Sequence, residues 1–421
     1  MSDVGMRRSS NQDSLAVSLA ADDKQARCRG HLFVVADGMG AHAAGELASQ
    51  LATDNIPHAY HKRRDLAPWD AIVAAVEDAN GRIHAKGQNS VDFHGMGTTC
   101  SCLLLLEEGA VAAHVGDSRI YRLRGTTIEQ LTFDHSLVWE MAAAGHASED
   151  EVPAYVPKNV ITRSLGPHSA VKVDLEGPLA VSAGDRFLLC SDGLTGPLNP
   201  KLIGMILASL PPDEAAQTLV DLANLLGGPD NITVIVAEVT EAMRSRGPLD
   251  CESTGPASAG GSLAPEDWLY VALASGGLLA AIGLGAAGSG IGAIVSAVLG
   301  VAVAVFGVTR RLARHAAPQH GRVSGQFGKG PHRRYAVEPS AENIEMLSDV
   351  VRQLEDLEDQ RKWPFDWGPI HEDRGRALRS IGAGDYSAAV VAYSSAVRRL
   401  MHAVRQTRLG TSDSGIQLGR D

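Results

Sequence analysis

Apolar residues in positions 1–240 fall into short runs that alternate with amphipathic stretches. The runs are rich in Val, Leu and Ile and end at Gly, Asp or Asn, a pattern typical of β-strands. Strands are predicted at residues 32–35, 98–106, 110–115, 119–123, 186–190 and 232–239, and helices at residues 43–55, 68–86, 137–144 and 213–226. Two runs flank Glu107-Glu108-Gly109, which predicts a β-hairpin. We therefore expect antiparallel sheets with helices packed outside them.

The pattern changes after residue 240. Residues 241–267 are rich in Gly, Ser and Pro, a composition that predicts a flexible linker. Residues 268–309 contain no charged side chain. One membrane span needs about 20 apolar residues, so this stretch is too long for one span and has the right length for two. We expect a transmembrane helical hairpin with spans at residues 268–287 and 291–309.

Two other readings of residues 268–309 stay open: a single long span, and a buried pair of helices in a soluble domain. Arg310, Arg311 and Arg314 follow the second span and begin a basic juxtamembrane segment at residues 310–337. Positive charge marks the cytoplasmic side of a span. Two spans therefore place both the N-terminal domain and the C-terminal residues in the cytoplasm, tethered to the cell membrane.

Helical periodicity returns in residues 338–405, with apolar side chains at Ile344, Leu347 and Leu354. Alanines and tyrosines between residues 377 and 396 have the spacing of one tetratricopeptide-type helix pair. An ordinary helical hairpin fits equally well, because such repeats normally occur in arrays of three or more. We expect a small α-helical tail at residues 338–405 and disorder at residues 406–421.

Composition narrows the class of protein. The formal net charge of the 421 residues is −11, which argues against a nucleic-acid partner. The five cysteines are scattered without the spacing of a zinc site. We expect Cys28, Cys100, Cys102 and Cys190 to be reduced thiols in a cytosolic domain.

Four aspartates stand at the ends of predicted strands. Asp37 and Asp192 each follow an apolar run and precede a glycine, Asp117 ends a third run, and Asp230 stands just before a fourth. Turn chemistry explains any one of them, since Asp-Gly and Asp-Asn are common turn residues. Four in one domain favour a shared cation site, because carboxylates that lie together repel one another. Oxygen ligands select Mg²⁺ or Mn²⁺ over zinc.

Two further residues fit phosphoryl chemistry. Gly38 has no side chain, so its carbonyl can approach a metal closely. Arg8 is a candidate for binding phosphate through a bidentate fork. Two cations about 4 Å apart activate and orient a water for in-line attack. Because the sequence has no Cys or Ser nucleophile motif, we expect direct attack on phosphorus by a metal-bridged hydroxide.

These motifs resemble, in order, those of the PPM/PP2C family of metal-dependent protein phosphatases in their bacterial form. The matching segments are RRSSNQDS (7–14), VVADGMGAHAAGE (34–46), GMGTTC (95–100), HVGDSRIYRLRG (114–125), LTFDHSLV (131–138), VITRSLG (160–166), GDRFLLCSDGL (184–194) and PDNITVIVAEV (229–239). The resemblance covers a domain at residues 1–240 and implies an α+β fold, the α-β-β-α sandwich. It also implies hydrolysis of phosphoserine and phosphothreonine in proteins with Mn²⁺ or Mg²⁺.

The resemblance implies metal-binding roles for five residues. Asp37 would bridge two core ions, and the carbonyl of Gly38 would bind one of them. Asp192 and Asp230 would complete the core site. Asp117 matches the position that, together with Asp192, holds a third ion in bacterial members.

The resemblance implies supporting roles for other residues. Arg8 would bind phosphate, Asp13 would hold metal-bound water, and Asn231 stands beside the last metal ligand. Residues 134–162 match a flap that borders the site. Met39 stands where eukaryotic members carry a histidine thought to be a general acid, so that role is not transferred.

Two more departures concern the N-terminus and the histidines. The usual first strand of the family is missing or shortened before the first motif. His42, His94, His114 and His135 lie within the motifs or beside them, and a structural role is the more common one for each.

Taken together, these features predict a membrane-tethered phosphatase with a monomeric catalytic domain. Its partners would be proteins phosphorylated on Ser or Thr and membrane Ser/Thr kinases. The alternative is a catalytically weak pseudophosphatase that acts as a membrane-anchored binding module. The complete set of carboxylates favours the enzyme.

Overall fold

The computed structural model describes residues 1–40, 43–145, 160–240, 327–361 and 366–413, together with residues 279, 280, 282, 286, 287, 294–298 and 301. The chain divides into two units, Met1–Cys251 with Gln326–Asp421, and Glu252–Gly325. The first unit contains the strands, the long helices and the candidate site.

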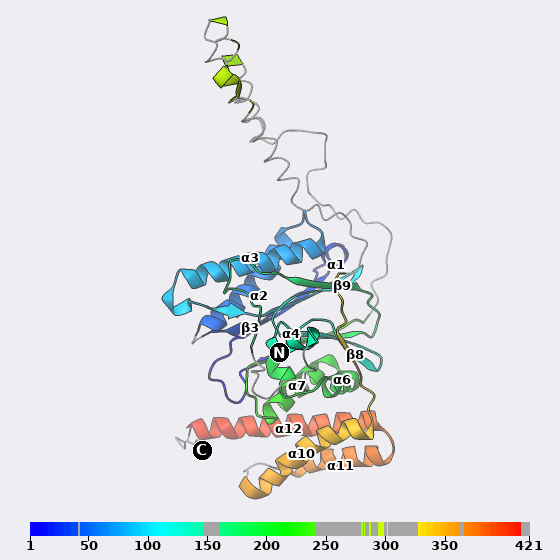
Figure 1. The fold of residues 1–421 in the computed structure, drawn as a ribbon. Coiled ribbons are helices and arrows are strands. Elements are labelled where there is room, and N and C mark those ends of the chain that lie inside the picture. The colour runs from blue at the N-terminus through cyan, green and yellow to red at the C-terminus, as the bar shows by residue number, and fades with distance from the viewer. Residues whose placement is uncertain are drawn as a thin grey trace. The chain divides into compact units, whose positions relative to one another are not determined.

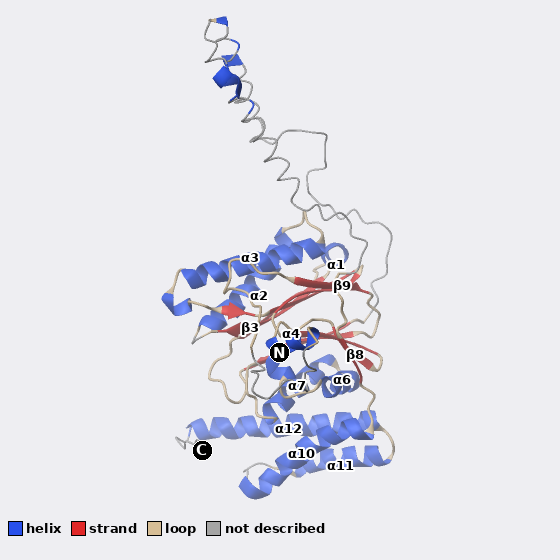
Figure 2. Cartoon of the chain, viewed as in Figure 1, coloured by secondary structure: helices blue, strands red, loops and turns tan. Residues whose placement is uncertain are grey.

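Two antiparallel sheets form the centre of this unit (Figure 2). The first has the order β1-β11-β10-β7-β8-β12, and the second has the order β2-β3-β5-β6-β9 with β4 paired to β3. The strands are β1 (Ser2–Asp3), β2 (Asp13–Ser18), β3 (His31–Met39), β4 (Gly97–Thr98), β5 (Cys100–Leu106), β6 (Gly109–Val115), β7 (Arg119–Arg124), β8 (Thr127–Gln130), β9 (Asp174–Leu179), β10 (Arg186–Cys190), β11 (Ile232–Glu238) and β12 (Arg333–Ala336).

Helices cover the outer faces of both sheets (Figure 1). The α-helices described in this unit are α1 (Asp23–Arg29), α2 (Ala44–Lys62), α3 (Pro68–Gln88), α4 (Leu137–Ala143), α5 (Asp192–Thr195), α6 (Pro200–Ser209), α7 (Pro212–Leu225), α10 (Ala341–Arg361), α11 (Gly368–Gly382) and α12 (Tyr386–Asp413). Helices α2 and α3 pack on the sheet that contains β3, and α6 and α7 pack on the sheet that contains β10.

The alternation of side chains along β3 shows how the layers form. Val34 and Leu32 face α2 and α3, whereas Val35 and Phe33 face the other sheet. All four are buried, since both faces of this strand are covered. The predicted α-β-β-α sandwich is confirmed for the N-terminal domain. The shortened first strand is the two-residue β1, which pairs with β11.

Three helices follow the sandwich in the chain and pack on its outer helix layer. Helix α12 contacts α7 and α6, and Ile344 and Leu347 of α10 belong to the same hydrophobic cluster as α6 and α7. Helices α11 and α12 are joined at Gly384, whose φ is +75°. Helix α12 continues to Asp413. Residues 406–413 are therefore helical, and the prediction that they are disordered was wrong.

The last residues of the basic segment predicted at residues 310–337 form a strand of the first sheet. Arg333–Ala336 form β12, which pairs antiparallel with β8 and extends the first sheet. Arg334 forms a 2.9 Å ion pair with Glu129, and the guanidinium of Arg333 lies 3.9 Å from the ring centre of Trp139. These arginines therefore belong to the folded domain, in contrast to the juxtamembrane role predicted for them.

No helix among the described residues has the length and apolar character needed to cross a membrane. The predicted hairpin at residues 268–309 lies largely outside the described residues, as do the predicted linker and residues 310–326. The same is true of residues 146–159 in the predicted flap. The hairpin, the linker and this part of the flap therefore stay predictions.

Three cysteines are buried free thiols, as expected: Cys100, Cys102 and Cys190. Cys28 is disulfide-bonded, contrary to the prediction of a reduced thiol. The scattered cysteines have no motif spacing that reveals such a pairing.

Candidate functional site

Carboxylates from both sheets lie at one end of the sandwich. Asp13 begins β2 and stands directly opposite Asp37 near the end of β3. Asp192 follows β10, Asp117 lies between β6 and β7, and Asp230 stands two residues before β11. Residues that are directly opposite on antiparallel strands point to the same side, so Asp13 and Asp37 both face the other sheet. The four aspartates singled out in the sequence therefore meet a fifth, Asp13.

Burial, together with repulsion from neighbouring carboxylates, raises the pKa values of Asp13, Asp37 and Asp117. Burial raises the pKa of Asp13 to about 7, with further contributions from Asp192 and Asp230. Burial likewise raises the pKa of Asp37 well above its ordinary value, with added repulsion from Asp13, Asp192 and Asp117. The pKa of Asp117 rises to about 8 through burial and the charge of Asp192. Like charges that lie close together disfavour ionisation, so this cluster is an unfavourable place for five negative charges without a cation.

Several oxygens of the cluster accept no hydrogen bond within the described chain. Asp13 Oδ1, Asp117 Oδ1 and Asp192 Oδ1 are all buried and lack a partner there. Such an oxygen costs free energy unless something binds it. A hard divalent cation prefers this donor type and also balances the negative charge. The donor chemistry thus fits Mg²⁺ or Mn²⁺.

The described residues contain no group of three His, Cys, Asp or Glu side chains already arranged around one point. Backbone carbonyls and waters supply the remaining ligands in magnesium sites. A magnesium site here would therefore combine the carboxylates with ligands of those two kinds.

The backbone of Asp37 is fixed by a pair of threonines. Asp37 N–H donates to Thr99 Oγ1 at 2.9 Å, and Thr98 Oγ1 donates to Asp37 O at 2.9 Å. Thr99 N–H also donates to Asp37 O at 2.8 Å. Both threonines are buried. Their role was not predicted, and the only signal was their place in the segment GMGTTC.

Gly38 is required for a reason that the sequence did not indicate. A Cβ atom at Gly38 would lie 2.1 Å from the carbonyl oxygen of Gly45 in α2 and 2.5 Å from that of Gln12. Gly38 N–H donates to the same Gln12 carbonyl at 3.1 Å. Close contact between β3, α2 and the N-terminal segment therefore excludes any side chain here. The prediction that its carbonyl binds a metal is compatible with this packing.

Arg8 lies beside the last of the aspartates. Its Nη2 donates to Asp230 Oδ2 at 2.7 Å, and the Arg8 side chain is 50% exposed. Asn231 holds the segment that carries Arg8, since its side chain donates to the carbonyls of Val4 and Ser10 at 2.9 Å. Arg8 thus combines a fixed position with free access from solvent.

Asp13 is held by a residue that was not predicted. Ser191 Oγ donates to Asp13 Oδ2 at 2.7 Å and accepts from Thr233 N–H at 3.0 Å. Ser191 is buried and directly precedes Asp192. The second oxygen of Asp13 is buried and has no partner among the described residues.

Two of the four histidines have clear structural roles. His135 Nδ1 accepts from Gly116 N–H at 2.9 Å, and its Nε2 lies 3.0 Å from Asp174 Oδ2. His114 stacks on His135, and burial lowers the pKa of His114 to about 3. Both rings support the turn that precedes Asp117.

His94 follows the short 3₁₀-helix Val91–Phe93, and His42 lies outside the described residues. Met39 pairs with Gly97 in β4 and supplies no titratable group. Neither His94 nor Met39 thus adds to the metal-binding and phosphate-binding candidates at the other residues of the site.

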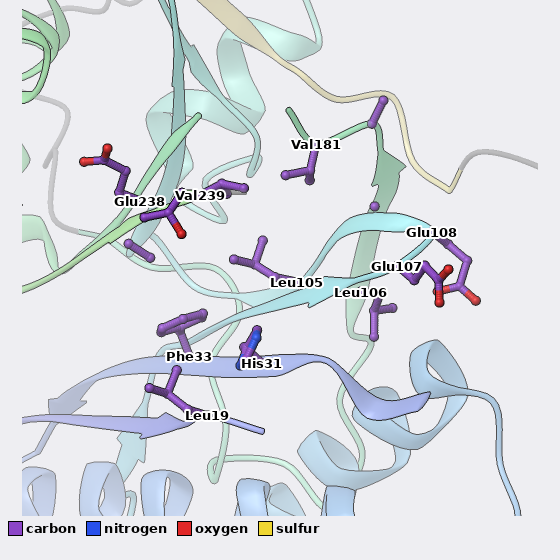
Figure 3. Close-up of a pocket in the computed structure, with 14 residues that line it drawn as sticks. Leu19, His31, Phe33, Leu105, Leu106, Glu107, Glu108, Val181, Glu238 and Val239 are labelled. Carbon is purple, nitrogen blue, oxygen red and sulfur yellow. The ribbon is translucent and has the colours of Figure 1, made fainter. Parts of the chain in front are cut away.

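A cavity of about 380 Å³ lies at the other end of the sandwich (Figure 3). Its lining includes His31 at the start of β3, Phe33, Leu105 and Val239. His31 and Asp37 are six positions apart, roughly 20 Å along an extended strand. None of the clustered aspartates lines it, so it is separate from the candidate site.

Comparisons with known proteins agree with this arrangement. The family model described as protein phosphatase 2C matches residues 6–227. The chain is 37% identical to protein phosphatase PhpP of Streptococcus pneumoniae over 247 residues. The alignment covers 57% of this chain and 96% of that protein. Over 284 residues the chain is 34% identical to serine/threonine protein phosphatase PstP of Mycobacterium tuberculosis, covering 67% of this chain and 51% of that protein.

The fold is similar to a solved structure as well. The crystal structure of the Mycobacterium tuberculosis serine/threonine phosphatase PstP matches with a TM-score of 0.51 and 36% identity, covering 57% of this chain and 97% of that chain. The family match at residues 6–227 ends before α10, α11 and α12.

Proposed function

The chain belongs to the protein phosphatase 2C family, and from this premise we propose that it hydrolyses phosphoserine and phosphothreonine in proteins. The observation that supports this most is the meeting of Asp13, Asp37, Asp117, Asp192 and Asp230 at one end of the sandwich. Buried oxygens without partners in the described chain and a half-exposed arginine lie at the same place.

Divalent ions would be held by the chain's oxygen ligands. Asp37, Asp192, Asp230 and the carbonyl of Gly38 would hold two Mn²⁺ or Mg²⁺ ions, and Asp117 with Asp192 would hold a third. When bound, such ions activate and orient water for direct in-line attack on phosphorus and offset phosphate charge. The raised pKa values of Asp37, Asp117 and Asp192 mean that ion binding would displace protons from the cluster.

The chain's own residues orient the reactants. Arg8 donates to Asp230, and no other contact of its guanidinium is seen within the described chain, so its remaining N–H groups could form a bidentate fork with phosphate oxygens. Asp13, held by Ser191, presents one oxygen toward the cluster, where it would accept a hydrogen bond from water. Met39 supplies no proton, so this scheme uses no general acid at that position.

Tethering to the cell membrane remains part of the proposal. Its support is the charge-free stretch 268–309 followed by Arg310, Arg311 and Arg314. The catalytic domain and the C-terminal helices would both lie in the cytoplasm, near membrane Ser/Thr kinases or their substrates. A reporter enzyme fused after Asp421 tests the topology. We expect the reporter to be active on the cytoplasmic side of the membrane. Reporter activity on the outer side would contradict two spans.

Hydrolysis of a phosphothreonine peptide by the full chain tests the function. Activity that requires added Mn²⁺ or Mg²⁺ and disappears with a chelator is expected. The full chain is needed because α10, α11 and α12 share a hydrophobic cluster with the catalytic domain. A folded protein without activity in either ion would favour the pseudophosphatase alternative.

A further inference from the structure

The last helix of the chain reaches the first strand. Arg405 in α12 lies 3.1 Å from Asp3 Oδ2 in β1 and 2.9 Å from Asp221 Oδ1 in α7. Asp3 and Arg405 are 402 positions apart in the sequence. One guanidinium thus joins the C-terminal helix, the N-terminal strand and a helix of the sandwich.

Two carboxylates share this guanidinium, and one of them is buried. Burial raises the pKa of Asp221, and the charge of Asp3 raises it further, whereas Arg405 lowers it. Without Arg405, two like charges would lie close together with one of them out of water. Loss of Arg405 would therefore push Asp3 away from α7.

Asp3 in turn fixes the segment that leads to Arg8. Its Oδ1 accepts from Gly5 N–H at 2.9 Å and from Asn224 Nδ2 at 3.1 Å. Gly5 has a φ of +82°, and a Cβ atom there would lie 2.2 Å from the carbonyl oxygen of Asp230. The chain from Asp3 is thus pressed against the backbone of Asp230, the residue whose side chain binds Arg8.

We propose that Arg405 is a positioning residue for hydrolysis: by holding Asp3, it fixes residues 4–8 so that Arg8 stands ready to bind the phosphate of the substrate. This inference rests on the proposed function and concerns the same site. It gives the C-terminal helices a role in substrate binding, although the family match ends before them.

Arg398 provides a matched control on the same helix. It also joins α12 to α7, through a 2.7 Å ion pair with Glu214 and a 3.1 Å hydrogen bond to Thr218. None of its described contacts reaches the N-terminal segment. If Arg405 only attached α12 to the domain, Arg405→Met and Arg398→Met would have the same consequences.

The first measurement is steady-state hydrolysis of a phosphothreonine peptide by the full chain at saturating Mn²⁺. Arg405→Met is expected to raise KM by about 10- to 100-fold, because a misplacement of about 1 Å can cost about 100-fold, with Mn²⁺ affinity unchanged. Arg398→Met should leave KM unchanged even where it lowers the melting temperature equally. Arg405→Lys keeps the positive charge, and its KM should lie close to that of the native chain. Equal KM values for Arg405→Met and the native chain would overturn the proposal.

A double-mutant cycle with Arg8 separates positioning from stability. Arg8→Met alone should raise KM strongly, and adding Arg405→Met should then change it little, because the positioned group is already gone. Independent, multiplying effects would overturn the role of Arg405 and leave the proposed function intact. An Arg8→Met variant with native kinetics would overturn the phosphate-binding role of Arg8 and this inference with it.

Discussion

Asp13 and Asp37 stand directly opposite each other on β2 and β3, so two carboxylates face the gap between the sheets at the same level. Paired strands bring such residues close, and like charges directly opposite are destabilising. Stability alone does not favour this arrangement. It becomes favourable when the charge of Asp37 is offset by a divalent cation, as the proposed phosphatase mechanism requires.

The stability of the metal-free protein should fall as the pH rises. Aspartates in an unfolded chain ionise near about pH 4, whereas the folded-state pKa values of Asp13 and Asp117 are about 7 and about 8. Between these limits the folded state binds more protons than the unfolded state, so the free energy of unfolding decreases with rising pH. The contribution of these two groups is fully lost only well above about pH 8, once both have ionised in the folded state.

Thermal melting between pH 5 and pH 9 checks this, with chelator and with Mn²⁺. Saturating Mn²⁺ should remove most of the decline, because the ion replaces the protons. Asp117→Asn should flatten the metal-free curve. The same decline in Asp117→Asn as in the native chain would contradict the assignment to this cluster.

Ser191→Ala should weaken both the fold and the site. The substitution leaves Asp13 Oδ2 and the N–H of Thr233 without the hydroxyl that they share. Loss of these buried hydrogen bonds is expected to cost about 1–3 kcal/mol in the free energy of unfolding. Activity per folded molecule should fall as well, because Asp13 is no longer oriented. Denaturant titration and kinetics measure the two effects, and unchanged values for both would refute the role of Ser191.

Gly38→Ala should be strongly destabilising. The added Cβ would meet the Gly45 carbonyl at 2.1 Å, and backbone atoms cannot move away easily. A loss of more than about 3 kcal/mol is expected in the free energy of unfolding. Gly81→Ala is the matched control, because Gly81 lies in α3 with open space around its Cβ position. That change should stabilise the protein by about 0.5–1 kcal/mol. A tolerated Gly38→Ala would show that β3 and α2 pack less closely than described.

Glu176→Gln should loosen the segment that leads into β12. Glu176 is buried; its Oε2 accepts from Gly330 N–H at 2.7 Å, and its Oε1 lies 2.9 Å from His332 Nε2. The neutral amide cannot accept at both positions. Hydrogen exchange at residues 333–336 should become faster, while exchange in β10 stays slow. Equal protection of β12 in both proteins would mean that Glu176 does not anchor it.

The sequence predicted those features whose cause is local. Apolar runs such as Leu32–Val35 indicate buried strands, and so they predict antiparallel sheets with helices packed outside them. The α-β-β-α sandwich itself was implied by the family resemblance. The aspartates at strand ends predict the carboxylate cluster because strand ends of two packed sheets converge. Asp13 was recognised through its motif alone, because no apolar run precedes it.

Other features depend on contacts between distant segments and have no local signal. The reason for a glycine at position 38 is the approach of α2, which the residues around it do not reveal. The segment Arg333–Ala336 was predicted to be part of a basic juxtamembrane segment, and its sequence does not reveal that it pairs with β8. Arg405 and Asp3 are ordinary surface residues by their local patterns, and only the folded chain brings them together.

The proposed hydrolysis depends on metal ions that the aspartate cluster would bind. The most direct measurement is Mn²⁺ binding by calorimetry together with phosphothreonine-peptide hydrolysis, for the native chain, Asp37→Asn and Asp192→Asn. Asp185→Asn is a suitable control, because Asp185 is equally buried but pairs with Arg124, at the start of β10 and away from the cluster. Both site variants are expected to lose Mn²⁺ affinity and at least about 100-fold in activity, whereas Asp185→Asn should keep both per folded molecule. Mn²⁺-dependent activity that survives in the Asp37→Asn and Asp192→Asn double variant would contradict the proposed role of the aspartate cluster.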